Sequence, residues 1–168
     1  NLLQQLTHDH KEITAFSRQT VSTNQTHVTW HQITSDLINT EQAQIPLWIC
    51  AAPIWILPEY YDWLLSYGIR RIVILSSTSR FTKKTSSDSN ELATAQRLID
   101  SENSLEAWAA AHQIEWIILR PTLIYGYGED KNISEIARFI IRFGFFPLLG
   151  AAKGLRQPIH AEDVSTTC

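Results

Sequence analysis

The chain has 168 residues, 44% of them hydrophobic, which suffices for one ordinary core and one domain. Its formal net charge of −3 and its pI near 6.1 give no electrostatic reason to expect nucleic acid or an anionic membrane as a partner. No apolar run approaches the ~20 residues that span a bilayer, and no secretory signal opens the chain, so we expect a cytoplasmic protein. The two cysteines, Cys50 and Cys168, do not form a disulfide framework.

Strand-like and helix-like segments alternate from the beginning of the chain. Short apolar or β-branched runs predict strands over residues 13–17, 27–33, 46–52, 71–75 and 114–119. Apolar residues at helical spacing predict helices over 2–10, 54–67 and 89–112, and a further helix that Asn132 starts and Gly144 ends. Such alternation predicts right-handed βαβ units, and hence an α/β fold with a doubly wound, Rossmann-like parallel sheet.

Two local predictions follow from particular residues. Asp88 with Glu91 three positions later is typical of a capping box at the start of the long helix. The run from Trp116 to Leu119 has the character of a buried central strand, and Pro121 should end its pairing because proline donates no backbone hydrogen bond.

Ligands of doubly wound sheets bind outside the carboxyl ends of the strands. The residues expected there are Ser17-Arg18, Asp36-Leu37, Ala51-Ala52-Pro53, Ser76-Ser77-Thr78 and Arg120-Pro121-Thr122. Small residues at the third and fourth of these ends let a flat, phosphate-bearing ligand approach the backbone closely. The alternative is that small and polar residues simply end strands, which is less convincing for five ends at regular spacing.

Three motifs resemble those of one enzyme family. They are RIVILSSTS at 71–79, LRPTLIYG at 119–126 and RQPIHAEDV at 156–164. In this order and spacing the chain resembles the extended or atypical short-chain dehydrogenase/reductases, which are NAD-dependent epimerase/dehydratase-like. The resemblance implies an NAD(P)-binding oxidoreductase or epimerase acting on a small or nucleotide-sugar-like substrate.

The resemblance also implies roles for individual residues. Arg18 would receive an adenosine 2′-phosphate, which favours NADP over NAD as the cofactor, because guanidinium binds phosphate bidentately. Thr78 would be the catalytic Ser/Thr. The remaining cofactor-binding candidates are Ser17, Asp36, Leu37, Ala51, Ala52, Pro53, Ser76, Ser77, Pro121 and Thr122. The substrate-binding candidates are Tyr125, Asn132, Arg156 and His160, with Asp163 as a structural acid.

The chain departs from the family pattern in two places. The glycine-rich loop that lays a pyrophosphate on a helix amino end is absent, and we expect it to precede Asn1 in a longer protein. The catalytic YxxxK pair is also absent. The expected tyrosine falls at Ala93 or Thr94, and the expected lysine at Arg97 or Leu98. Tyr125 and Tyr127 are the other phenols near the expected cleft.

These observations leave two functional interpretations open. The first is an NADP-dependent, epimerase/dehydratase-like oxidoreductase of the atypical branch, and the second is a non-catalytic NAD(P)-binding sensor or scaffold module. Residues 1–126 would form a partial dinucleotide-binding domain, and 127–168 the start of the smaller substrate-binding portion. No residue spacing indicates a metal site. The oligomeric state stays open, a dimer included.

Overall fold

The computed structural model describes residues 2–8, 10–21, 25–34, 44–128, 130, 132–147 and 157–168. Its strands are β1 Ile13–Ser17, β2 Val28–Gln32, β3 Leu47–Cys50, β4 Arg71–Leu75, β5 Glu115–Leu119, β6 Ile124–Tyr125 and β7 Ile159–His160. Its helices are α1 Leu2–His8, the 3-10 helix η2 Ile54–Tyr60, α2 Tyr61–Ser66, α3 Ser79–Thr82, α4 Ser89–Ala111, α5 Ile133–Phe143 and α6 Ala161–Thr167.

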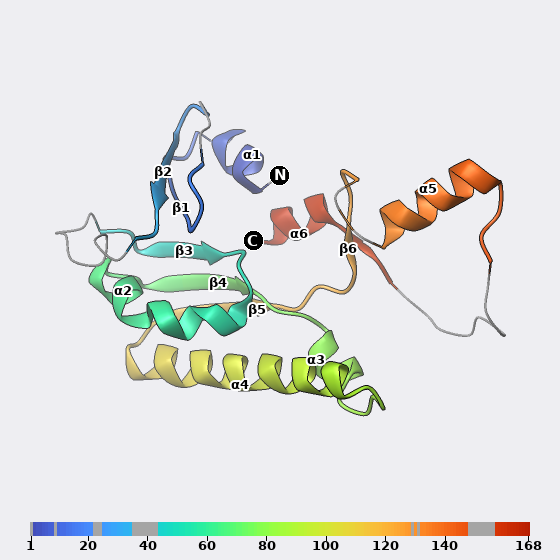
Figure 1. The fold of residues 1–168 in the computed structure, drawn as a ribbon. Helices are drawn as coiled ribbons and strands as arrows, with labels where there is room; N and C mark the ends of the chain where they lie inside the picture. Colours follow the sequence, from blue (N-terminus) through green and yellow to red (C-terminus); the bar gives the residue numbers. More distant parts are fainter. Residues whose placement is uncertain are drawn as a thin grey trace.

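All paired strands run parallel, which confirms the predicted α/β class with parallel sheets. The strands form three sheets, in the orders β1-β2, β3-β4-β5 and β6-β7. Helix α4 runs along the three-stranded sheet, with η2 and α2 beside it (Figure 1). Among the described residues, no helix is both long enough and apolar enough to cross a membrane.

The hydrophobic core lies between one face of the three-stranded sheet and the helices η2, α2 and α4. Ile72 and Ile74 of β4 point to this face, where they meet Leu98 and Leu105 of α4. Each such side chain contributes about 1.5–3 kcal/mol when fully buried. The alternation of side chains along β4 therefore fixes which face of the sheet the helices cover.

An aromatic cluster holds the two-stranded sheet against the three-stranded one. The Phe16 ring of β1 is stacked on the Trp48 ring of β3, with 5.3 Å between the ring centroids. Trp63 and Tyr67 meet both of these rings edge-on. Three of the four rings, Trp48, Trp63 and Tyr67, come from the segment 48–67, so the aromatic residues of this segment belong to the core or pack against it.

Strand β5 differs from the prediction of a buried central strand. It is an edge strand among the described residues, and β4 is the central strand of this sheet. Trp116 is 38% exposed and Ile117 is 49% exposed, whereas Ile118 is buried. The side chain of Ile117 lies on the face away from α4, beside Val73 in the register, so the helices do not cover it.

The helical segments begin and end where their local chemistry requires. The predicted helix 54–67 is divided into η2 and α2, because Pro58 lacks a backbone donor. Helix α2 ends at Ser66 with Tyr67 as its C-cap, and Gly68 follows with a φ of +68°, which favours glycine.

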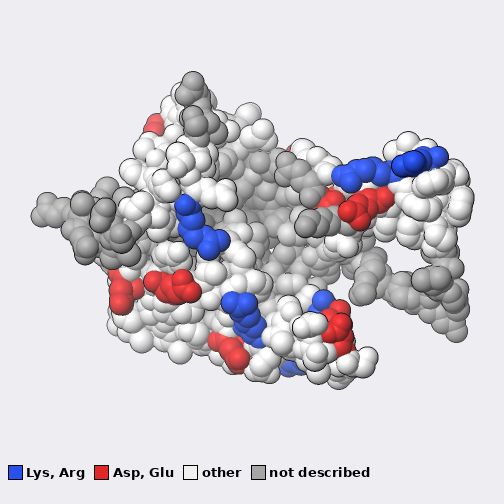
Figure 2. Space-filling model, viewed as in Figure 1, with Lys and Arg blue, Asp and Glu red and all other residues white. Residues whose placement is uncertain are grey.

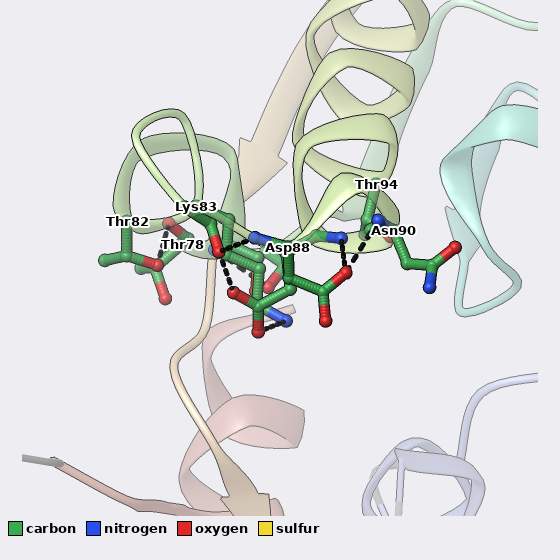
Figure 3. A network of polar contacts seen from close by, with 10 residues as sticks. Thr78, Thr82, Lys83, Asp88, Asn90 and Thr94 are labelled. Atoms are coloured by element: carbon green, nitrogen blue, oxygen red, sulfur yellow. Dashed lines mark hydrogen bonds and ion pairs between the residues drawn. The ribbon is translucent and has the colours of Figure 1, made fainter.

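Asp88 caps α4 as predicted, and its carboxylate accepts from the backbone nitrogens of Asn90 at 2.8 Å and Glu91 at 3.4 Å (Figure 3). The backbone nitrogen of Asp88 donates to the Ser86 hydroxyl at 3.2 Å. The carboxylate of Glu91 pairs with Lys83 at 3.1 Å and accepts from the Ser86 hydroxyl at 2.6 Å.

Candidate functional site

The carboxyl ends of β3, β4 and β5 meet at one edge of the sheet. Cys50 lies opposite Ile74, and Leu75 lies opposite Leu119 in the parallel register. The segments that follow these strands are tied together. The backbone nitrogen of Ser76 donates to the Leu119 carbonyl at 2.8 Å, and that of Thr78 donates to the Pro121 carbonyl at 3.2 Å. The structure therefore brings the predicted segments 76–78 and 120–122 into contact.

A buried carboxylate lies under this edge and joins three segments. Glu102 of α4 is 0% exposed. It accepts from the Ser76 hydroxyl at 2.5 Å and from Arg120 Nε and Nη2 at 3.0 and 2.6 Å, and it pairs with Arg80. We call Ser76, Arg80, Glu102 and Arg120 the Glu102 cluster. It fixes the ends of β4 and β5 relative to α3 and α4.

Glu102 is not among the residues that the sequence motifs indicate. The signal was present, because Glu102 follows Leu98 by four residues and precedes Leu105 by three, which places an acid on the apolar face of α4. Carboxylates are almost never fully buried unless they are paired. An acid at such a position predicts cationic partners elsewhere in the chain.

A pocket of about 440 Å³ opens beside this edge, and we call it the site pocket. Its walls come from the end of β5, from β6 and from the β7–α6 junction. The residues that line it are Arg120, Pro121, Thr122, Tyr125, Gln157, Pro158, Ile159, His160 and Asp163. Four of the predicted site residues thus share one cavity: Pro121, Thr122, Tyr125 and His160. The hydroxyl of Thr122 also donates to the Gln157 carbonyl, which closes one side.

The turn after β6 brings its backbone against the imidazole of His160. Gly126 has a φ of +129°, and a Cβ added there would lie 2.7 Å from His160 Nε2. Tyr127 follows with a φ of +58°, a conformation that is uncommon for a residue with a side chain. Glycine is thus required at 126 both by the backbone and by the imidazole.

Several predicted residues lie outside this pocket. Ala51, Ala52 and Pro53 follow β3 at the same sheet edge. Ser17 is the last residue of β1 in the separate two-stranded sheet, and Arg18 follows it and is exposed. Asp36, Leu37 and Arg156 lie outside the described residues.

Asn132 stands directly before α5, where the sequence predicts that helix to start. Its side chain makes no capping hydrogen bond to α5. The carboxylate of Asp130 accepts instead from the backbone nitrogens of Asn132 and Ser134 and from the Ser134 hydroxyl, at 3.1, 3.0 and 2.6 Å. These hydrogen bonds, the Ser134 hydroxyl first, hold the pKa of Asp130 well below its ordinary value.

The positions on α4 that correspond to the family's tyrosine and lysine carry no acid–base pair. The Thr94 hydroxyl donates to the Asn90 carbonyl one turn earlier at 2.8 Å. Leu98 is buried in the core. The guanidinium of Arg97 lies over the Trp55 ring, 4.7 Å from its centroid. Arg97 therefore keeps the positive charge but uses it in a cation–π contact.

In the described part of the chain, no group of three or more His, Cys, Asp or Glu side chains is arranged to hold a metal ion. Acidic and basic side chains are interspersed on the face shown in Figure 2. Cys50 and Cys168 are free, and burial raises the pKa of both thiols, so neither thiol is activated.

Solved structures similar to this chain include three UDP-sugar epimerases. One is UDP-glucose 4-epimerase from Thermotoga maritima, solved with UDP-glucose, at 12% identity and a TM-score of 0.68. Another is UDP-N-acetylglucosamine 4-epimerase from Bacillus cereus, at 18% and 0.69. A third is UDP-N-acetylglucosamine 4-epimerase from Methanobrevibacter ruminantium M1, solved with UDP-N-acetylmuramic acid, at 15% and 0.64. The matches cover 98%, 99% and 98% of this chain and 66% of each of those chains.

These likenesses confirm the Rossmann-like fold, and the chain spans about two thirds of the length of each of these structures. A comparison with curated proteins gives no match. The model of one family, however, matches residues 59–168, which is more than half of the chain and includes the site pocket. On that match, the chain belongs to the NAD dependent epimerase/dehydratase family.

Proposed function

We propose that this chain forms the cofactor-binding part, and the beginning of the substrate-binding part, of an NADP-dependent, epimerase-like oxidoreductase of the atypical branch. The observation that carries the proposal is the continuity of the sheet edge with the site pocket. Thr78 is hydrogen-bonded to Pro121, and Pro121 and Thr122 line the pocket with Tyr125 and His160. A nicotinamide ring bound at Pro121 and Thr122 would share the site pocket with Tyr125 and His160.

The residues present fit parts of a dinucleotide. Ala51 and Ala52 leave room for a flat ligand at the end of β3, and the Ser77 hydroxyl accepts from the Ser79 backbone nitrogen at 3.1 Å in the loop after β4. Arg18 is exposed directly after β1, where its guanidinium would donate hydrogen bonds to a 2′-phosphate. When bound, the cofactor would supply hydride transfer, which no side chain provides.

We propose a nucleotide-sugar-like substrate, with residues 127–168 as the start of the portion that binds it. Two of the similar structures were solved with a UDP-linked sugar, and the site pocket lies where the predicted dinucleotide-binding and substrate-binding portions meet. The pocket is lined by the Tyr125 phenol, the His160 imidazole and the Asp163 carboxylate, which suit a polar substrate rather than an apolar one.

A second function is favoured by the state of α4. Thr94 bonds its own helix, Leu98 is core and Arg97 is held by Trp55, so the helix offers no proton-exchanging side chain at these positions. A non-catalytic NAD(P)-binding sensor or scaffold module requires none. Such a module would bind NAD(P) at the same site but would not catalyse a reaction.

Fluorescence titration of the full-length protein with NADPH and NADH tests the proposal. We expect NADPH to bind more tightly than NADH, and Arg18→Ala to remove the preference. Arg70→Ala is the matched control, because Arg70 is an exposed arginine at the amino end of β4. NADPH-dependent turnover on a panel of carbonyl compounds would favour the enzyme, and tight binding without turnover would favour the module. If neither NADPH nor NADH binds, both proposed functions are contradicted.

A further inference from the structure

Several polar side chains in the wall of the site pocket are already held by the protein. The Thr122 hydroxyl donates to a backbone carbonyl, that of Gln157. Arg120 donates from Nε and Nη2 to the buried Glu102 carboxylate, at 3.0 and 2.6 Å. The Nδ1 atom of His160 accepts from a backbone nitrogen of α6 at 3.3 Å. Each of these side chains is therefore oriented by a partner within the chain.

The Asp163 carboxylate and the Tyr125 phenol line the same pocket without such a partner. Among the described residues, neither group takes part in a side-chain hydrogen bond or an ion pair. A carboxylate offers acceptor oxygens only, whereas a phenol can both donate and accept. Asp163 is also the one carboxylic acid among the described residues that line this pocket. The pocket thus presents an anionic acceptor and a neutral hydroxyl to a ligand that enters it.

The fold holds Asp163 at a defined place in the wall. The parallel pairing of β6 with β7 sets His160 opposite Tyr125. The side chain of His160 then caps α6, and Asp163 stands in the first turn of that helix. Val164, the next residue, is buried and anchors this turn to the protein. The carboxylate therefore reaches the pocket from a fixed helical turn.

An acid in the first turn of a helix also has a simpler use, because it stabilises the amino end of the helix. Asp163 and Glu162 both occupy that turn of α6. The Glu162 side chain, however, is 64% exposed and does not line the pocket. Stabilisation of the helix is therefore common to both acids, whereas access to the pocket distinguishes Asp163.

We propose that Asp163 determines substrate specificity: its carboxylate accepts hydrogen bonds from the hydroxyls of a neutral sugar ring and disfavours a ring that carries a carboxylate. This inference rests on the proposed function, which places the nicotinamide and the substrate in the same pocket. Hydrogen bonds to a carboxylate are roughly twice as strong as those between neutral groups. A ring carboxylate replaces a donor with a second negative charge. At about 4 Å, two like charges weaken binding about fivefold even with the full dielectric of water between them.

Calorimetric titration of the full-length protein with UDP-glucose and UDP-glucuronate tests this role without requiring turnover. The two ligands differ at one carbon, which carries a hydroxymethyl group in the first and a carboxylate in the second. We expect the wild type to bind UDP-glucose at least about fivefold more tightly. Asp163→Asn should bring the two dissociation constants close together, whereas the matched control Glu162→Gln should keep the wild-type ratio. An unchanged ratio in Asp163→Asn, or tighter binding of UDP-glucuronate by the wild type, would overturn the inference.

Thermal unfolding separates specificity from stability. Asp163→Asn and Glu162→Gln should lower the melting temperature by similar, small amounts, because each removes one negative charge from the first turn of α6. A purely structural role of Asp163 would leave the ratio of the two dissociation constants unchanged. Binding of NADPH by a wild type that binds neither UDP-sugar would overturn this inference alone. Failure of the wild type to bind NADPH would instead overturn the proposed function, whereas the UDP-sugar ratio measured without NADPH would still decide the role of Asp163.

Discussion

Substitution of Glu102 by glutamine is expected to destabilise the fold severely. The side chain is fully buried and receives hydrogen bonds from Ser76 and Arg120 and an ion pair from Arg80, whose side chain is 18% exposed. Glutamine keeps the shape but removes the charge, and it leaves two guanidinium groups without a counter-ion. Breaking a buried pair from one side costs about 3–5 kcal/mol. That is a large part of the 5–15 kcal/mol by which ordinary domains are stable.

Urea unfolding followed by tryptophan fluorescence measures this loss as a lower transition midpoint. Asp100→Asn is the matched control, because its carboxylate is on the same helix but exposed, where it accepts from Gln96 at 2.8 Å. A double-mutant cycle with Arg120→Met should show a coupling of at least ~1 kcal/mol between Glu102 and Arg120. A loss below about 1 kcal/mol in Glu102→Gln, or no coupling, would refute the role of the Glu102 cluster.

Two further predictions concern the segments around the site pocket. Gly126→Ala should lower stability by about 1–3 kcal/mol in thermal unfolding and should move the His160 resonances. Gly128→Ala is the control: its φ is +74°, and apart from its chain neighbours no described residue lies within 4 Å of the added Cβ, so that only backbone strain is expected. Equal effects of the two substitutions would contradict the contact with His160. Because the pKa of Asp130 is lowered in the fold, the hydrogen bonds of its carboxylate should stabilise the start of α5 fully above the ordinary carboxyl pKa. This stabilisation should be lost only in strong acid, where the carboxylate becomes protonated. Asp130→Asn should remove this stabilisation at every pH, which would be seen as faster amide hydrogen exchange at Ser134 relative to an amide of α4. Unchanged exchange at Ser134 would refute the role of Asp130 at the start of α5.

Much of the fold could be predicted from local patterns. The strand 71–75 and the helix from Ser89 to Ala111 follow directly from a β-branched run and from an Asp88 cap before an apolar face. The exposure of β5 could not be predicted in this way. Its residues are as apolar as those of β4, and only the pairing order shows that one strand is central and the other is at an edge.

The site was predictable where one segment carries it and not where several meet. The motif at 119–126 indicated Pro121, Thr122 and Tyr125. The Glu102 cluster joins residues up to 44 positions apart, so no single stretch reveals it, and the same holds for the contact of His160 with Gly126. Asn132 stands at the position that usually carries the cap of a helix, whereas the carboxylate of Asp130, two residues earlier, accepts from the backbone nitrogen of Ser134 in α5.

The central claim is that a nicotinamide dinucleotide lies along the ends of β3, β4 and β5, with its nicotinamide at the site pocket. Methyl NMR of the full-length protein with labelled alanine and threonine tests it most directly. Addition of NADPH should shift the methyl resonances of Ala51, Ala52, Thr78 and Thr122 together, and leave that of Thr94 on α4 unchanged. Saturable binding of NADPH that shifts none of the first four resonances would contradict the account.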